Sequence, residues 1–198
     1  CENRCRRKMV DGPINIRGLK RYAVDMAGDV ENPPCAPSTG KTIAVVGGGP
    51  SGLTAAYYLT LMGHKVTVYD MHKKLGGMMR YGIPSYRYPR EKLDGEIASI
   101  LSLGIEVHTE TKIGRDISFE ELKNKYDAVY VAIGAHTDKK VGIEGEDAEG
   151  VISAVEMLRG IGNDIMPDFT GKNVAVIGGG VAGDQVDVGE LAGGQGTD

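Results

Sequence analysis

The segment that decides the fold spans residues 42–52 and reads TIAVVGGGPSG. Residues 42–46 form an apolar run of strand length, and Gly47, Gly49 and Gly52 follow it with the spacing G-x-G-x-x-G. We expect the first glycine to make a tight turn out of the strand and the second to let the backbone approach a phosphate group. The third would let a helix pack closely on the strand.

The residues after this turn complete a β-α-β unit. Residues 53–62 carry a helical pattern that Gly63 can end, and residues 65–70 form a second strand-like run that ends on Asp70. The helix N-terminus offers N–H groups and a positive dipole end to phosphates, and a carboxylate at Asp70 can accept hydrogen bonds from ribose hydroxyls. We predict a dinucleotide site, with a purely structural glycine turn as the alternative. The motif does not separate FAD from NAD(P), but the acid makes NADP the least expected ligand here.

The composition narrows the class of protein. The chain has 198 residues, of which 30 are glycine, a formal net charge of −4 and three cysteines. It lacks the G-X-Y period of collagen, the polarity of a disordered chain, the cysteines of a disulfide framework and the basic excess of a nucleic-acid binder. No apolar stretch approaches the roughly 18 residues of a membrane span, and no signal-peptide pattern opens the chain. We therefore expect a cytoplasmic protein with no membrane span and no nucleic-acid partner.

The sequence pattern divides the chain into three parts. Residues 1–40 hold a basic, cysteine-bearing start, a helical pattern and a linker rich in glycine and proline. Residues 41–171 hold the unit described above and its continuation. Residues 172–198 open with a second apolar run and a second glycine turn, repeating the layout of the first.

Further elements follow from periodicity and capping. Residues 128–133 read as a buried strand, and residues 71–90 as a long loop with few regular cues. Helices are expected at residues 13–26, 91–103, 118–125 and 153–160, and strands at residues 105–109 and 173–177. Two capping boxes mark helix starts, Ser118 with Glu121 and Ser153 with Glu156.

The two ends suggest that the sequence is a piece of a longer polypeptide. It starts at Cys1 rather than at Met, and residues 189–198 show no apolar periodicity. A processed N-terminus and a natural flexible tail are the alternative.

Residues 75–84 read LGGMMRYGIP and form the most specific motif of the chain. Residues 44–53 resemble the FAD-binding start of two-dinucleotide-binding flavoproteins. Residues 75–84, together with residues 128–135 and 145–151, resemble the glutamate synthase small (β) subunit family. That family includes the large subunit of NADH-dependent ferredoxin:NADP oxidoreductase and the N-terminal part of dihydropyrimidine dehydrogenase. Residues 13–24 are similar to the helix that joins its iron–sulfur region to its FAD domain. The resemblance implies an α/β fold: a Rossmann-like FAD-binding domain with a parallel sheet, preceded by a short helical segment of iron–sulfur type and followed by the start of a second Rossmann unit.

The resemblance also implies which residues bind FAD. The glycine turn would hold the diphosphate, and Asp70 the adenosine ribose. Arg80 would meet a phosphate or a flavin carbonyl, since its planar fork of donors suits both; a surface salt bridge is the alternative. The implied cofactor residues are Gly47, Gly49, Pro50, Ser51, Gly52, Asp70, Gly77, Arg80, Gly82, Ile83, Pro84, Ile113, Ala132 and Gly134. The flavin does the redox chemistry, so no catalytic side chain is expected.

Two cysteines near the start are candidate metal ligands. Cys1 and Cys5 precede a basic run at residues 6–8. In the resembled family, a cysteine pair at this place belongs to a region that binds 4Fe–4S clusters, and thiolates are soft ligands that suit iron. A cubane needs four ligands, so the others would lie outside this chain; two free thiols are the alternative. Cys35 has no expected role, and no cysteine pair lies beside the flavin region, which argues against a redox-dithiol mechanism.

The second glycine turn is less complete than the first. Gly178, Gly180 and Gly183 fit G-x-G-x-x-G, and the resembled family binds NAD(P)H at this place. However, Val181 follows where the family usually has Asn, and residues 185–198 lack the amphipathic helix that should pack under the turn. NAD(P)H is therefore expected as an electron donor, but we do not expect this chain alone to hold it.

These observations support two functions of different classes. The first is an FAD-dependent NAD(P)H oxidoreductase, a subunit that passes electrons between NAD(P)H and iron–sulfur clusters of itself or of partner redox subunits. The second is a non-catalytic FAD-binding module or structural subunit within a larger redox complex, which the incomplete second turn favours. A simple NAD-dependent dehydrogenase is disfavoured by residues 75–84. His136 could approach the flavin, but its loop position favours a solvent-facing ring.

Overall fold

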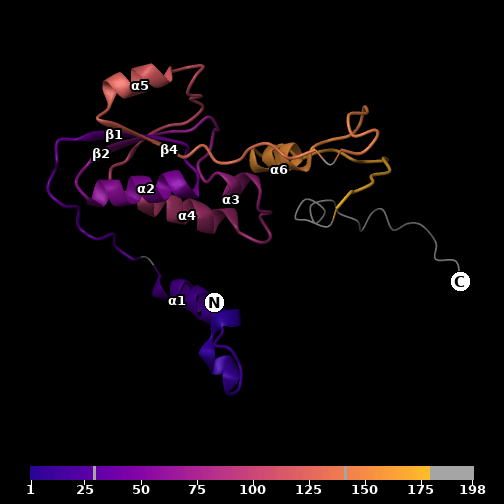
Figure 1. The fold of residues 1–198 in the computed structure, drawn as a ribbon, viewed down its shortest axis with the longest axis horizontal. Coiled ribbons are helices and arrows are strands. Elements are labelled where there is room, and N and C mark those ends of the chain that lie inside the picture. Colours follow the sequence, from indigo (N-terminus) through magenta and orange to yellow (C-terminus); the bar gives the residue numbers. More distant parts are fainter. Residues whose placement is uncertain (29, 141, 179–198) are drawn as a thin grey trace, which may run out of the picture. The chain divides into compact units, whose positions relative to one another are not determined.

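The computed structural model describes residues 1–28, 30–140 and 142–178 (Figure 1). The chain forms two compact units, Cys1–Pro33 and a second unit that starts at Pro34. The division falls inside the glycine- and proline-rich linker expected within residues 1–40. In the part of the chain that the structure describes, no helix has the length and apolar character needed to cross a bilayer.

The second unit is built on a parallel sheet of four strands, which confirms the predicted α/β fold. The strand order is β3-β2-β1-β4, and every pairing is parallel. The strands are β1 (Thr42–Val46), β2 (Lys65–Tyr69), β3 (Glu106–His108) and β4 (Ala128–Val131). Val46 of β1 is level with Tyr69 of β2 and with Val131 of β4, so three strands end at one edge of the sheet. In open parallel sheets this carboxyl edge is where ligands bind.

Helices cover both faces of this sheet. Figure 1 shows α2 and α4 on one side of the strands and α5 on the other. The helices of this unit are α2 (Pro50–Leu61), α3 (Met78–Tyr81), α4 (Arg90–Leu101), α5 (Phe119–Lys125) and α6 (Ala154–Gly162). Because both faces are covered, alternate residues of β1 are buried in opposite directions, which explains why residues 42–46 read as one apolar run.

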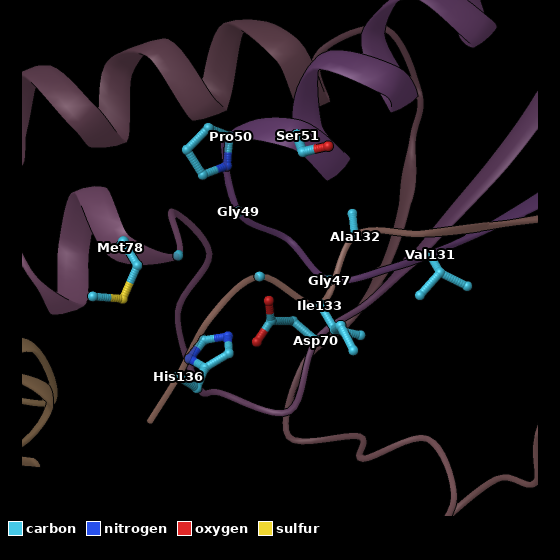
Figure 2. A pocket seen from close by; sticks show the side chains of 12 residues that line it. Gly47, Gly49, Pro50, Ser51, Asp70, Met78, Val131, Ala132, Ile133 and His136 are labelled. Atoms are coloured by element: carbon cyan, nitrogen blue, oxygen red, sulfur yellow. The ribbon is translucent and has the colours of Figure 1, made fainter. Parts of the chain in front are cut away.

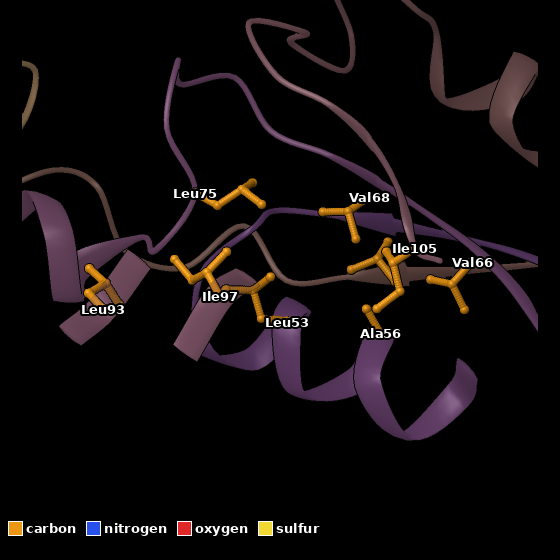
Figure 3. Packing of buried hydrophobic residues seen from close by; sticks show 9 residues of the cluster. Leu53, Ala56, Val66, Val68, Leu75, Leu93, Ile97 and Ile105 are labelled. Atoms are coloured by element: carbon orange, nitrogen blue, oxygen red, sulfur yellow. The ribbon is translucent and has the colours of Figure 1, made fainter. Parts of the chain in front are cut away.

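The two faces hold separate hydrophobic clusters. The larger lies between the sheet and helices α2 and α4 and is shown in Figure 3; its buried members are Val45, Leu53, Ala56, Val66, Val68, Leu75, Leu93, Ile97 and Ile105. The smaller lies beneath α5 and consists of Ala44, Val46, Tyr69 and Leu122. Together they fix the strand ends that carry the candidate site.

One predicted capping box forms in full, and the other forms its Ser153 bond. The Ser118 side chain accepts the Glu121 N–H at 3.1 Å, and the Glu121 carboxylate accepts the Ser118 N–H at 2.7 Å, which is a complete capping box. At α6, the Ser153 hydroxyl accepts the Glu156 N–H at 3.2 Å. Gly63 has a φ of +87° directly after α2, as expected of a helix stop.

Several predicted elements differ from the structure. Residues 128–133 were expected as a buried strand, but β4 is an edge strand of the described sheet with largely exposed side chains. Residues 173–177 form no strand, and Ile177 is 76% exposed, because the described residues offer this run no neighbouring strand. The loop expected at residues 71–90 contains the short helix α3, and α6 continues past Gly160 to Gly162.

The first unit contains two 3₁₀ turns, η1 (Glu2–Arg4) and η2 (Arg6–Met9), and helix α1 (Ile16–Ala27). The Asn15 side chain caps α1 by accepting the Gly18 N–H at 3.0 Å. The helix predicted at residues 13–26 is therefore confirmed, with its start three residues later.

Gly52 sets how closely α2 packs on β1, and this generates a test. A Cβ at Gly52 would lie 1.8 Å from the Gly47 carbonyl oxygen, whereas a Cβ at Gly95 in α4 meets nothing within 4 Å. We expect Gly52→Ala to destabilise the protein by about 1–3 kcal/mol through overpacking. Gly95→Ala should stabilise it by about 0.5–1 kcal/mol, since alanine favours a helix. Urea unfolding measures both, and equal effects of the two substitutions would contradict this packing.

Candidate functional site

A pocket of about 360 Å³ lies at the carboxyl edge of the sheet (Figure 2). This volume is within the usual range of small-molecule sites. The pocket is formed by the glycine turn after β1, the end of β2, the start of α3 and the segment after β4. Its lining residues are Gly47, Gly49, Pro50, Ser51, Asp70, Gly77, Met78, Val131, Ala132, Ile133, Gly134 and His136.

Gly47 joins the glycine turn to the segment after β4. Its φ is +110°, and its N–H donates to the Tyr69 carbonyl at 2.7 Å. A Cβ at Gly47 would lie 2.2 Å from the Ala132 carbonyl oxygen, and the Ala132 N–H donates to the Val46 carbonyl at 2.7 Å. The turn and the end of β4 therefore pack backbone against backbone, which only glycine permits at this position.

Gly49 has a different role from its neighbours. Its φ is in the ordinary negative range, and a Cβ there would meet only the Gly77 Cα, at a normal contact distance of 3.5 Å, among the residues described. Gly77, in contrast, has a φ of +53°, and its Cβ would lie 2.6 Å from the Gly49 Cα. The protein itself therefore requires glycine at Gly77 but not at Gly49. A side chain at Gly49 would instead fill pocket space.

Asp70 lines the pocket and holds the glycine turn in place. Its carboxylate accepts the Gly48 N–H at 2.6 Å and the His72 N–H at 2.7 Å, one with each oxygen. The residue is 7% exposed. Each carboxylate oxygen can accept a second hydrogen bond, so Asp70 retains acceptor capacity for a ligand hydroxyl.

The N-terminus of α2 forms one wall of the pocket. Gly49 is the N-cap, and Pro50 follows in the first turn, where its missing N–H costs nothing. The first-turn N–H groups of a helix have no acceptor within the helix, and the dipole makes this end favourable for anions. The Ser51 hydroxyl lines the same wall and shares a hydrogen bond of 3.1 Å with the Tyr130 hydroxyl of β4.

The structure brings together most of the residues predicted from the first glycine turn and from the end of β4. Gly47, Gly49, Pro50, Ser51, Asp70, Gly77, Ala132 and Gly134 all line the pocket. Gly52 lies behind this wall, in the contact between α2 and β1.

Arg80 lies outside this lining. Its side chain is 4% exposed, its Nε donates to the Leu75 carbonyl at 2.6 Å, and its guanidinium pairs with Asp94. The alternative, a salt bridge, is present in part: it joins the buried guanidinium of Arg80 to an Asp94 side chain that is 59% exposed. Its donors hold the loop before α3 against α4, and its expected contact with a phosphate or flavin stays a prediction.

The remaining predicted residues also lie elsewhere. Gly82 ends α3, Ile83 accepts a hydrogen bond from Arg90, and Pro84 is buried. Ile113 packs against the cluster beneath α5. Gly178 has a φ of +114°, Gly180 and Gly183 lie outside the described residues, and Cys1 and Cys5 belong to the first unit.

The pocket contains four residues that were not among the predicted site residues. Met78 starts α3 directly after Gly77, and Val131 and Ile133 flank Ala132 at the end of β4, so their position beside predicted residues was the available signal. His136 was expected to face solvent, but its half-buried ring lines the pocket. The alternative that His136 approaches the cofactor site was available from its place after Gly134, which has a φ of +66°, but the loop position favoured solvent.

The site holds no evident metal centre. Among the residues that the structure describes, no group of three or more His, Cys, Asp or Glu side chains is arranged to hold an ion. Next to the pocket, the His72 ring is partly buried, and this burial lowers its pKa below the usual value although Asp70 opposes the shift. The ring is therefore neutral at neutral pH.

Comparisons with known proteins agree with this geometry. The chain is 40% identical to the β subunit of the NADP(+)-dependent formate dehydrogenase of Moorella thermoacetica, over 91% of this chain and 29% of that protein. It is 37% identical to the small chain of the NADPH glutamate synthase of Mycobacterium tuberculosis, over 92% of this chain and 41% of that protein. The resemblance to glutamate synthase small subunits is confirmed, and the chain spans less than half of each relative.

A solved structure has a similar fold. FprA of Mycobacterium tuberculosis in complex with NADPH superposes with a TM-score of 0.56 at 26% identity, over 63% of this chain and 29% of that protein. A family model described as pyridine nucleotide-disulphide oxidoreductase matches residues 41–187, well over half of the chain and all of the described sheet. With its parallel sheet and glycine turn, the chain therefore belongs to the pyridine nucleotide-disulphide oxidoreductase family.

Proposed function

We propose that the chain binds FAD in the pocket at the carboxyl edge of the sheet and serves as the flavin part of an NAD(P)H-dependent electron-transfer subunit. The observation that carries this proposal is Gly49. The fold leaves room for a side chain there, and that side chain would occupy the space in front of the α2 N-terminus. A glycine that lets the backbone approach a phosphate, at a position where the fold itself tolerates a Cβ, is what a diphosphate site requires.

Each wall of the pocket suits a different part of the dinucleotide. The first-turn N–H groups of α2 and the Ser51 hydroxyl would hold the diphosphate. Asp70, fixed by two backbone N–H groups, would accept from ribose hydroxyls. When bound, FAD supplies two-electron acceptance and one-electron release. The residues of this chain bind it and orient it, and none needs to move a proton.

Iron–sulfur partners form the second part of the proposal. Cys5 is half-buried, and backbone N–H groups of Ile14, Arg7 and Lys8 lower the pKa of its thiol. Such donors stabilise a thiolate, the form that ligates iron. Cys1 is exposed four residues earlier. We propose that both contribute to a 4Fe–4S cluster whose other ligands lie outside this sequence, and that the electrons pass to clusters of this or partner subunits.

The relatives support this assignment as a subunit. The Moorella protein is named as the β subunit of a formate dehydrogenase, and the mycobacterial protein as the small chain of a glutamate synthase. We propose that the second glycine turn of Gly178, Gly180 and Gly183 contributes to an NAD(P)H site whose remaining residues lie outside this sequence. The domain boundaries at residues 40 and 171 and the cytoplasmic location stay predictions.

The FAD site can be tested at Gly49. Gly49→Val places a side chain in front of the α2 N-terminus, and we expect it to weaken FAD binding at least about tenfold, equivalent to about 1.4 kcal/mol. Gly95→Val in α4 is the matched control, because it makes the same change where no atom lies within 4 Å. Flavin fluorescence titration gives both affinities. Unchanged FAD binding by Gly49→Val would contradict the site.

The role of Asp70 is tested by Asp70→Asn, which removes the charge but keeps the shape. We expect FAD binding to weaken about tenfold or more, since hydrogen bonds to charged groups contribute about 1.5–3 kcal/mol. Asp127→Asn is the control: Asp127 also accepts a backbone N–H, that of Thr42 at 2.8 Å, but at the opposite end of β1. Equal loss of FAD affinity in both variants would show a general effect on the sheet instead.

A binding module without catalysis is the second candidate function, favoured by the exposed residues 173–177, which form no strand. Anaerobic NADPH should bleach the visible absorption of the FAD-loaded protein if the chain is catalytic. Dithionite, a chemical reductant, is the control, because it shows whether the bound flavin can be reduced at all. A band that dithionite bleaches and NADPH leaves unchanged would contradict catalysis by this chain alone and support the module.

A further inference from the structure

His136 was expected to face solvent, but it is the histidine of the pocket lining. It lies after β4, in the segment that follows Gly134, and its ring lines the pocket. Figure 2 shows His136 and Asp70 both reaching into this space, from the segments that follow β4 and β2. The His72 ring, from the segment after β2, lies 5.5 Å from the His136 ring, centroid to centroid.

One ring nitrogen of each of these two histidines lacks a partner among the described residues. His136 Nδ1 and His72 Nε2 are buried and have no hydrogen-bond partner within the described part of the chain. The two histidines away from the pocket are satisfied: His64 Nδ1 lies 2.6 Å from the Thr39 hydroxyl, and His108 Nε2 lies 2.9 Å from the Glu106 carboxylate. Buried polar atoms are nearly always paired, so the orphaned nitrogen in the pocket points to a bound group.

Both rings are held by contacts that do not use these nitrogens. The Arg159 side chain donates to the His136 carbonyl, which fixes the backbone that carries the ring. The His72 ring packs against the Tyr81 ring with centroids 4.5 Å apart, and its backbone N–H donates to Asp70. The pair is therefore positioned before any ligand arrives, and one buried nitrogen of the pocket-lining ring has no partner within the described part of the chain.

We propose that His136 contacts the bound dinucleotide directly, with Nδ1 hydrogen-bonded to a hydroxyl group of its sugar part. This inference rests on the proposed FAD site. A hydroxyl fits better than a phosphate because the Asp70 carboxylate lies in the same pocket and repels anions, whereas hydroxyls can donate to it. The phosphates have their own wall at the α2 N-terminus. His72, packed against His136, positions the ring.

The test compares three variants by flavin fluorescence titration with FAD. His136→Phe keeps a ring of similar size but removes the polar nitrogens, and we expect it to weaken FAD binding about tenfold. His136→Gln keeps a side chain that can donate and accept, and it should recover most of that loss. His64→Gln, away from the pocket, is the control and should bind FAD as the wild type does. Urea unfolding of each variant separates loss of folding from loss of contact.

A spectroscopic readout identifies the contact itself. In protein labelled with ¹⁵N-histidine, FAD should shift the His136 ring nitrogens and leave those of His64 and His108 in place. This inference would be overturned if the wild-type protein binds FAD, its His136 nitrogens do not shift and His136→Phe binds FAD with full affinity. The FAD site itself would then still stand. A wild-type protein that binds no FAD would overturn the proposed function, and this inference with it.

Discussion

The structure depends on the close backbone contact between the glycine turn and the two segments that face it. At Gly47 the turn touches the Ala132 carbonyl, and at Gly77 the loop before α3 touches the Gly49 Cα, with no side chain between them in either case. Hydrogen bonds fasten the same contacts, from the Gly76 N–H to the Gly48 carbonyl and from the Ala132 N–H to the Val46 carbonyl. Three chain segments therefore meet at one strand end, and the pocket is the space that their missing side chains leave.

Asp70 links this packing to the recognition of a ligand. The carboxylate that we assign to the ribose also holds the Gly48 N–H, so the same group shapes the turn and faces the ligand. Fold and binding are thus coupled through one residue. Asp70 directly follows β2, and from this strand end its side chain reaches both the turn and the pocket.

Much of the fold could be predicted because its signals are local. The run at residues 42–46, the capping box at Ser118 and the stop at Gly63 each report on neighbours a few residues away, and each is confirmed. The exposure of β4 and the absence of a strand at residues 173–177 could not be predicted. Both depend on whether another segment packs beside them, which an apolar run does not reveal.

The residues of the candidate site also fall into those that local sequence predicts and those that it does not. Gly47, Gly49 and Asp70 were predictable because the motif prescribes their backbone geometry and chemistry. Arg80 and His136 depend on long-range packing. Neither the burial of Arg80 beside Asp94 nor the position of the His136 ring in the pocket follows from neighbouring residues alone.

The most direct test of the account is a crystal structure of the protein with FAD. We expect the diphosphate within hydrogen-bond distance of the Ser51 backbone N–H, beside Gly49, whereas a diphosphate bound away from the α2 N-terminus would contradict the account.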